Sequence, residues 1–126
     1  MVLVDKSVWI RFLAGREPYA SGLDDLLTRD EVAGHDLIFG ELLIGDRGGR
    51  ATLLRAYTLM HHAAVVPHAE VVEFVRRRRL SGRGVGWLDV NLLASAVVGG
   101  LRVWTADARF AAAVEDLQLS YQNSGS

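Results

Sequence analysis

Cysteine is absent from the sequence and the net charge is only −1, and each of these shortages excludes a class of protein. Without cysteine the chain forms neither a disulfide framework nor a thiolate metal site, which fits a reducing compartment without proving one. A net charge near zero gives no general attraction to nucleic acid or to a membrane surface. Any such binding must therefore rest on local basic patches.

Long apolar segments are also lacking. The longest apolar run, Leu92 to Val98, is too short to cross a bilayer, and Asp5 comes too early for a signal peptide. We therefore expect a cytoplasmic protein with no membrane association. Half of the 126 residues are hydrophobic, which is enough for one buried core. We expect a single domain over residues 1–121 and a loose tail over residues 122–126.

Short apolar segments alternate with stretches of helical periodicity along the chain, and they predict strands and helices respectively. Strands are expected at residues 1–4, 31–34, 63–66, 101–105 and 117–121. Helices are expected at residues 8–13, from residue 18, and at residues 37–44, 50–60, 68–80, 88–98 and 107–114. This alternation is typical of an α/β domain. We expect three layers, with helices covering a mostly parallel central sheet of four to five strands.

The first strand leads directly into a candidate functional residue. Residues 1–4 are apolar on both sides, as in the central strand of a parallel sheet, and Asp5 follows at the carboxyl end. Open α/β sheets build their sites at that edge, although Asp5 could equally just end the strand. Ser7 is expected to cap the next helix, and Asp36 the helix that begins at Leu37.

Three more acids are expected near Asp5. Asp107 follows the strand at residues 101–105, and the helices that carry Glu41 and Asp89 start at the same edge of the sheet. Glu41 by itself is either an edge residue of its helix or a buried acid. Together, however, four carboxylates at close range repel one another unless cations neutralise them. Oxygen ligands without cysteine or convergent histidine favour Mg²⁺ or Mn²⁺, and two such ions can promote phosphodiester cleavage.

Four stretches of the sequence resemble the PIN-domain ribonucleases, and within them the VapC-type toxins of bacterial toxin–antitoxin pairs. They are residues 2–9 (VLVDKSVW), 40–45 (GELLIG), 84–94 (GVGWLDVNLLA) and 103–110 (VWTADARF). Their order and spacing are more specific than any one of them, and the resemblance covers nearly the whole chain. It implies a PIN-like fold and Mg²⁺-dependent endonucleolytic cleavage of RNA. By this resemblance, the metal-binding and catalytic acids of the family correspond to Asp5, Glu41, Asp89 and Asp107.

The resemblance also implies a partner, the cognate antitoxin, which we expect on the early helices around Trp9 and Phe12. We further expect a homodimer. Around the acids we expect supporting contacts from the hydroxyl groups of Ser7 and Thr105. We expect contacts to RNA from three basic residues, Lys6, Arg83 and Arg109.

Three alternatives remain open at this point. Lys6 stands where the family often has Thr or Ser, and its ammonium is either solvated or turned toward the carboxylates or an RNA phosphate. The chain could keep the PIN fold as a non-catalytic interaction module. A phosphoacceptor receiver domain is disfavoured because it needs an Asp at the end of the third strand, where this chain has Val66 and Pro67.

Overall fold

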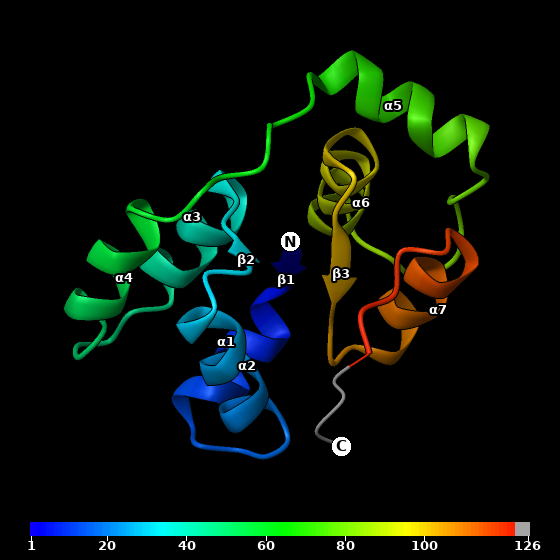
Figure 1. Ribbon diagram of the computed structural model, residues 1–126. Coiled ribbons are helices and arrows are strands. Elements are labelled where there is room, and N and C mark those ends of the chain that lie inside the picture. Colours follow the sequence, from blue (N-terminus) through cyan, green and yellow to red (C-terminus); the bar gives the residue numbers. More distant parts are fainter. Residues whose placement is uncertain (123–126) are drawn as a thin grey trace.

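The computed structural model describes residues 1–122, so the expected loose tail, apart from Gln122, lies outside the described residues. Along the chain, two helices separate the first strand from the second, and four helices separate the second from the third (Figure 1). The strands are β1 (Val2–Val4), β2 (Val32–Ala33) and β3 (Arg102–Trp104). The helices are α1 (Lys6–Leu13), α2 (Tyr19–Thr28), α3 (Asp36–Ile44), α4 (Ala51–Thr58), α5 (His68–Arg77), α6 (Trp87–Gly99) and α7 (Ala108–Asp116).

The described strands form one parallel sheet in the order β2-β1-β3. Its centre is β1, which is buried along its whole length, as expected for a strand that is apolar on both faces. Val4 pairs with Trp104, so β1 and β3 end together at one edge of the sheet. The residues that follow them, Asp5 and Thr105, are therefore neighbours.

The sheet has fewer strands than we expected. Within the described residues, isolated parallel bridges take the place of the strands predicted at 63–66 and 117–121. Gly34 pairs with His62, just before the first of these segments, and Val103 pairs with Ser120 in the second. The first segment leaves the sheet edge toward α5 and runs into Pro67, which has no N–H to donate to a ladder. The second segment is shortened because Leu117 and Gln118 form the turn that ends α7. The parallel α/β class is confirmed, and the count of four to five strands is wrong.

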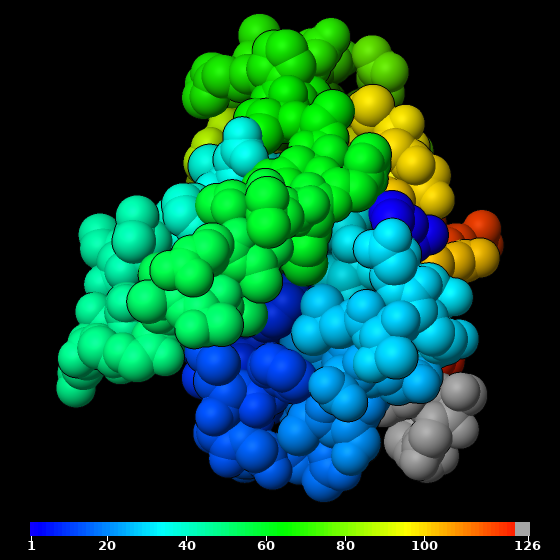
Figure 2. Space-filling view, turned by 60° about the vertical axis from the view of Figure 1, so that its left-hand side comes forward, coloured from blue at the N-terminus to red at the C-terminus, as the bar shows by residue number. Residues whose placement is uncertain are grey.

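Helices cover the sheet in packed pairs. Helix α1 packs on α2, α3 on α4 and α5 on α6. In Figure 1 the strands lie between α1 to α4 on one side and α6 with α7 on the other. The segment between α4 and α5 crosses the surface as a green band in the space-filling view (Figure 2). No helix among the described residues is long and apolar enough to span a membrane.

Helices α1 and α3 begin earlier than expected, and both changes affect the site. Helix α1 begins at Lys6 with Asp5 as its N-cap, in place of a cap at Ser7. Helix α3 begins at Asp36 with His35 as its N-cap, in place of a cap at Asp36 itself. In each case the capping residue has extended backbone, and its side chain reaches the N–H group two residues further on.

Candidate active site

Asp5 is the most buried of the four acids, with a relative exposure of 6%. Its Oδ2 accepts hydrogen bonds from the backbone N–H of Ser7 at 3.4 Å, the Ser7 hydroxyl at 2.7 Å and the Thr105 hydroxyl at 2.8 Å. Its Oδ1 accepts none from the described residues and is not sealed from solvent. One oxygen thus fixes the carboxylate, and the other remains available to a ligand.

The two hydroxyls that hold Asp5 also organise the segment after β3. The Oγ atom of Ser7 lies 3.2 Å from Oγ1 of Thr105 and accepts a hydrogen bond from the N–H of Ala106 at 2.9 Å. The N–H of Asp107 donates to Oγ1 of Thr105 at 3.1 Å. Ser7 and Thr105 therefore connect the end of β1 to the start of α7 and fix where Asp5 and Asp107 lie relative to each other.

Asp107 and Asp89 both occupy the N-terminal ends of helices. Asp107 is the N-cap of α7, and its Oδ1 accepts a hydrogen bond from the N–H of Phe110 at 2.9 Å. Asp89 lies in the first turn of α6, and its Oδ2 accepts one from the N–H of Gly86 at 3.2 Å. Helix N-termini carry partial positive charge, which by itself stabilises a carboxylate at both positions. Each carboxylate keeps one oxygen that no described residue contacts by a hydrogen bond.

The electrostatics of Asp89 place three acids and one lysine in the same site. Burial raises the pKa of Asp89, the hydrogen bond from Gly86 lowers it, and the charges of Asp5 and Asp107 raise it further. The ammonium of Lys6 lowers the same pKa. Because such effects weaken with distance, Asp5, Asp107 and Lys6 all lie within electrostatic range of Asp89.

Glu41 reaches this group through Lys6. The Nζ atom of Lys6 lies 3.4 Å from Oε2 of Glu41, and each side chain is 40% exposed. Lys6 is the first residue of α1, and of the alternatives left open for its ammonium, the structure shows it turned toward the carboxylates. Glu41 is a part-exposed helix residue, as the edge interpretation predicted, with its carboxylate held at the site.

The four acids have the right chemistry for a hard divalent cation but are not closed around one. All the donors are carboxylate oxygens, and the three aspartates each offer an oxygen that accepts no hydrogen bond from the described residues. Over residues 1–122, no three acidic or histidine side chains stand close enough to enclose an ion. Mg²⁺ usually retains several waters and is held by one or two carboxylates, so these residues fit a partly hydrated ion.

The two arginines expected to contact RNA lie in different surroundings. Arg83 donates a hydrogen bond to Oδ2 of Asp116 at 2.6 Å, which ties it to α7. Arg109 is exposed and forms no hydrogen bond or ion pair with any described residue. Its side chain lies over Gly84, where an added Cβ would stand 2.8 Å from Cδ of Arg109. Arg109 is therefore the more available cation of the two.

Comparison with known proteins identifies the fold that carries this site. Residues 2–115 match the PIN domain family. The chain belongs to the PIN domain family. It is also 45% identical over 114 residues to "Ribonuclease VapC32" of two Mycobacterium tuberculosis strains, CDC 1551 / Oshkosh and ATCC 25618 / H37Rv, an alignment that covers 90% of each chain. The resemblance found in the sequence is thereby confirmed, and the receiver-domain alternative is excluded.

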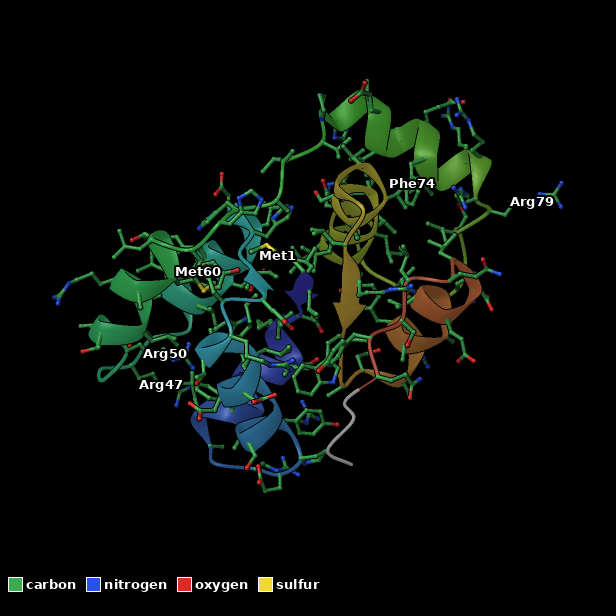
Figure 3. The ribbon with its side chains drawn as sticks, viewed as in Figure 1. Met1, Arg47, Arg50, Met60, Phe74 and Arg79 are labelled. Atoms are coloured by element: carbon green, nitrogen blue, oxygen red, sulfur yellow. The ribbon has the colours of Figure 1, made fainter. Side chains whose placement is uncertain are left out.

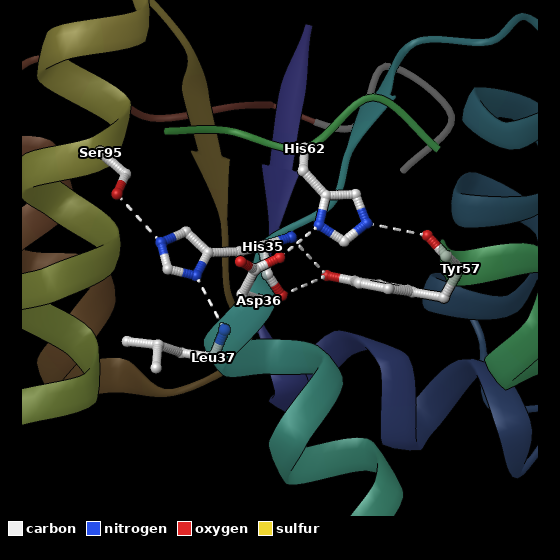
Figure 4. Close-up of polar contacts among 6 residues, drawn as sticks. All are labelled: His35, Asp36, Leu37, Tyr57, His62 and Ser95. Carbon is white, nitrogen blue, oxygen red and sulfur yellow. Dashed lines mark hydrogen bonds and ion pairs between the residues drawn. The ribbon is translucent and has the colours of Figure 1, made fainter. Parts of the chain in front are cut away.

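This PIN domain also contains a buried polar network around His35, which the sequence analysis missed (Figure 4). Nδ1 of His35 accepts a hydrogen bond from the N–H of Leu37 at 3.1 Å, so Nε2 carries the proton and donates to Oγ of Ser95 at 2.9 Å. The N–H of His35 donates to the Tyr57 hydroxyl at 2.8 Å. Burial lowers the pKa of His35 and raises the pKa of Tyr57.

His62 extends the network to the surface. Its Nδ1 lies 2.8 Å from Oδ1 of Asp36, and its Nε2 lies 3.0 Å from the carbonyl oxygen of Tyr57 (Figure 4). The partners come from α3, α4 and α6 and from the segment after α4. Tyr57 and Ser95 lie 22 and 60 positions from His35, and Asp36 lies 26 positions from His62. No local pattern could have revealed these pairs. The network fixes the start of α3, the helix that carries Glu41.

Proposed function

We propose that this PIN domain is a metal-dependent endoribonuclease and the toxin of a toxin–antitoxin pair. One observation carries the proposal: the ends of β1 and β3 and the start of α6 bring Asp5, Asp107 and Asp89 together, and Lys6 links Glu41 to them. The 45% identity to a protein named a ribonuclease supports the same activity. RNA is then the substrate, and the cytoplasm, where cellular RNA is accessible, is the expected location.

The four acids have one shared role in this proposal, which is to hold Mg²⁺ or Mn²⁺. A divalent ion there would supply activated water and charge neutralisation at the scissile phosphate. Ser7 and Thr105 orient Asp5 so that Oδ1 remains available. Arg109 is a candidate contact to RNA phosphates. Lys6 is a second candidate once its ammonium leaves Glu41. Residues 1–121 form the functional domain.

A cleavage assay with matched substitutions tests this function. Asp89→Asn and Asp107→Asn should each lower Mg²⁺-dependent cleavage of single-stranded RNA by orders of magnitude, because a residue that holds a catalytic ion supports both nucleophile formation and charge stabilisation. Asp24→Asn is the control, since Asp24 is an exposed aspartate of α2. A folded protein that binds Mg²⁺ but cleaves no RNA would favour the alternative, a non-catalytic interaction module.

The antitoxin surface expected around Trp9 and Phe12 needs other side chains than these two. Trp9 is only 1% exposed and belongs to the core, and Phe12 is partly buried against it, so neither offers an open surface. The exposed apolar side chains of the packed helices α1 and α3 include Ile10, Leu13, Leu43 and Ile44. We assign the antitoxin to these residues, with an antitoxin arginine reaching the acids, because a guanidinium matches carboxylates geometrically.

Substitution of the most exposed of these residues tests the antitoxin surface. Ile44→Glu should weaken capture of the co-expressed antitoxin, because Ile44 is 85% exposed and a charge there would be buried by the partner. Leu59→Glu is the control, since Leu59 is 83% exposed but lies beyond α4. Equal capture by both variants would contradict this assignment.

The expected homodimer has a candidate interface between α5 and α6. A groove of about 370 Å³ there has an apolar floor that includes Phe74 and Val98, and charged side chains along α5. Figure 3 shows Phe74 on the side of α5 that faces α6. The acids Glu70 and Glu73 precede Arg77 and Arg78 along α5, so two copies packed with α5 antiparallel would pair unlike charges. Light scattering should therefore show a dimer that Val98→Asp dissociates and Leu59→Asp does not.

A further inference from the structure

Lys6 is the only basic side chain among the described residues that pairs with one of the four acids. It lies directly after Asp5 in the sequence, and its Nζ is 3.4 Å from Oε2 of Glu41, which is 35 residues away on α3. Both side chains are 40% exposed, so neither is locked in place by packing. The contact joins two elements that meet at the site.

The place of Lys6 in its helix is unfavourable for a cation. Lys6 is the first residue of α1, and the N-terminal end of a helix carries partial positive charge. A lysine there is stabilised only if nearby anions compensate for this repulsion. The carboxylates of the site supply that compensation, and Glu41 makes the direct contact. Local helix chemistry therefore does not explain the ion pair, whereas the surplus of negative charge does.

We infer that Lys6 is a built-in counterion of the acidic site, which competes with the metal ion for Glu41. The inference rests on the proposed metal-dependent function and adds to it a role for Lys6 in metal binding. Without metal, the ammonium offsets part of the repulsion among the four acids. With metal, the ammonium and the ion would compete for the Glu41 carboxylate, because two positive charges at such short range repel each other.

The structure gives Lys6 the means to leave. Its charge sits on a flexible four-carbon stem, and its part exposure provides a route into solvent. Glu41 would then be available to hold the ion, while the Asp5 carboxylate stays fixed by Ser7 and Thr105. Removal of the Lys6 charge should therefore strengthen metal binding.

Calorimetric titration of the whole protein with MnCl₂ or MgCl₂, without RNA, tests the inference. Lys6→Gln should bind the ion about three- to fivefold more tightly than the unsubstituted protein, the size expected when a part-exposed ion pair no longer competes. Lys6→Thr should behave in the same way, and Lys6→Arg, which keeps the charge, should not bind more tightly. Arg55→Gln is the control for a general loss of positive charge, because Arg55 is an exposed residue of α4.

Two further comparisons separate the possible results. In a Glu41→Gln background the gain from Lys6→Gln should disappear, and a gain that persists there would overturn competition for Glu41. Unchanged or weaker metal binding by Lys6→Gln, with metal binding by the unsubstituted protein intact, would also overturn it. If neither protein binds either ion at millimolar concentration, the proposed metal-dependent function itself fails.

Discussion

Thr105 donates a hydrogen bond to Oδ2 of Asp5 at 2.8 Å, although the two residues are 100 positions apart in the sequence. The contact follows from the sheet, because Val4 pairs with Trp104 and the next residue of each strand carries the interacting side chain. The same Thr105 oxygen accepts the N–H of Asp107. One hydroxyl therefore positions two acids of the candidate site.

Thr105→Val should weaken metal binding by about tenfold, because loss of a group that orients a ligand typically costs 10- to 100-fold in affinity. It should also lower the free energy of unfolding by about 1–2 kcal/mol, because a hydrogen bond to a charged group is lost. Calorimetric metal titration and urea unfolding measure the two effects. Thr105→Ser keeps the hydroxyl and should match the unsubstituted protein closely in metal affinity and in the free energy of unfolding. Equal effects of the Ser and Val substitutions would contradict a role for the hydroxyl.

Asp89→Asn should stabilise the metal-free fold while it abolishes stabilisation by metal. The pKa of Asp89 is raised chiefly by burial and further by Asp5 and Asp107, so its ionised form is disfavoured in the folded protein. The amide removes that charge and can still accept the hydrogen bond from Gly86. Melting curves with and without Mg²⁺ measure this, since a ligand that binds only the folded state raises the melting temperature. Earlier melting of the variant without metal, together with intact RNA cleavage, would indicate a structural carboxylate.

The three aspartates of this site were predictable because each follows a strong local signal. An apolar strand ends at Asp5, a second strand precedes Asp107, and a glycine-rich segment leads into the helix of Asp89. Parallel strand order then brings these positions to one edge, and the helix boundaries differ from the prediction by only a few residues. The overall fold was predictable for the same reason: periodicity distinguishes strands from helices along most of the chain.

The ion pair and the histidine network were not predictable from such signals. The sequence indicates neither that Lys6 contacts Glu41 nor that His35 contacts Ser95, because each contact depends on how separate helices pack. The two outer strands were overpredicted for a related reason. Residues 63–66 are apolar, but an edge segment pairs only as far as its backbone stays beside the sheet, and here it departs after one bridge.

Stability should fall at mildly acidic pH because of His35. Burial lowers its pKa below the usual value of 6.5, so the unfolded chain binds a proton below pH 6.5 that the folded protein does not. The free energy of unfolding therefore decreases as the pH falls from about 6.5 through the lowered pKa. His35→Asn, which keeps a capping oxygen for α3, should be less stable at pH 7.5 and less sensitive to pH. Urea unfolding at several pH values measures both.

An exposed histidine supplies the control for that experiment. His61→Asn changes a side chain at the surface and should keep the pH dependence of the unsubstituted protein. A pH dependence that is the same for the unsubstituted protein and for His35→Asn would remove His35 as its source.

RNA affinity should depend more on Arg109 than on Arg83, although both are arginines near the start of α6 or α7. Arg83 is already paired with Asp116 at 2.6 Å, whereas Arg109 is exposed and forms no ion pair with any described residue. Arg109→Gln should weaken binding to single-stranded RNA at low salt and reduce the slope of log affinity against log salt by about 0.7, the value for one phosphate contact on a single strand. Arg83→Gln should leave that slope nearly unchanged and lower stability slightly, by about 0–1 kcal/mol for a surface ion pair.

Fluorescence anisotropy over a salt series in EDTA, which prevents metal-dependent cleavage, measures both slopes. An unchanged slope for Arg109→Gln would exclude this contact, because a phosphate contact of this kind cannot be lost without a change in the number of released counterions.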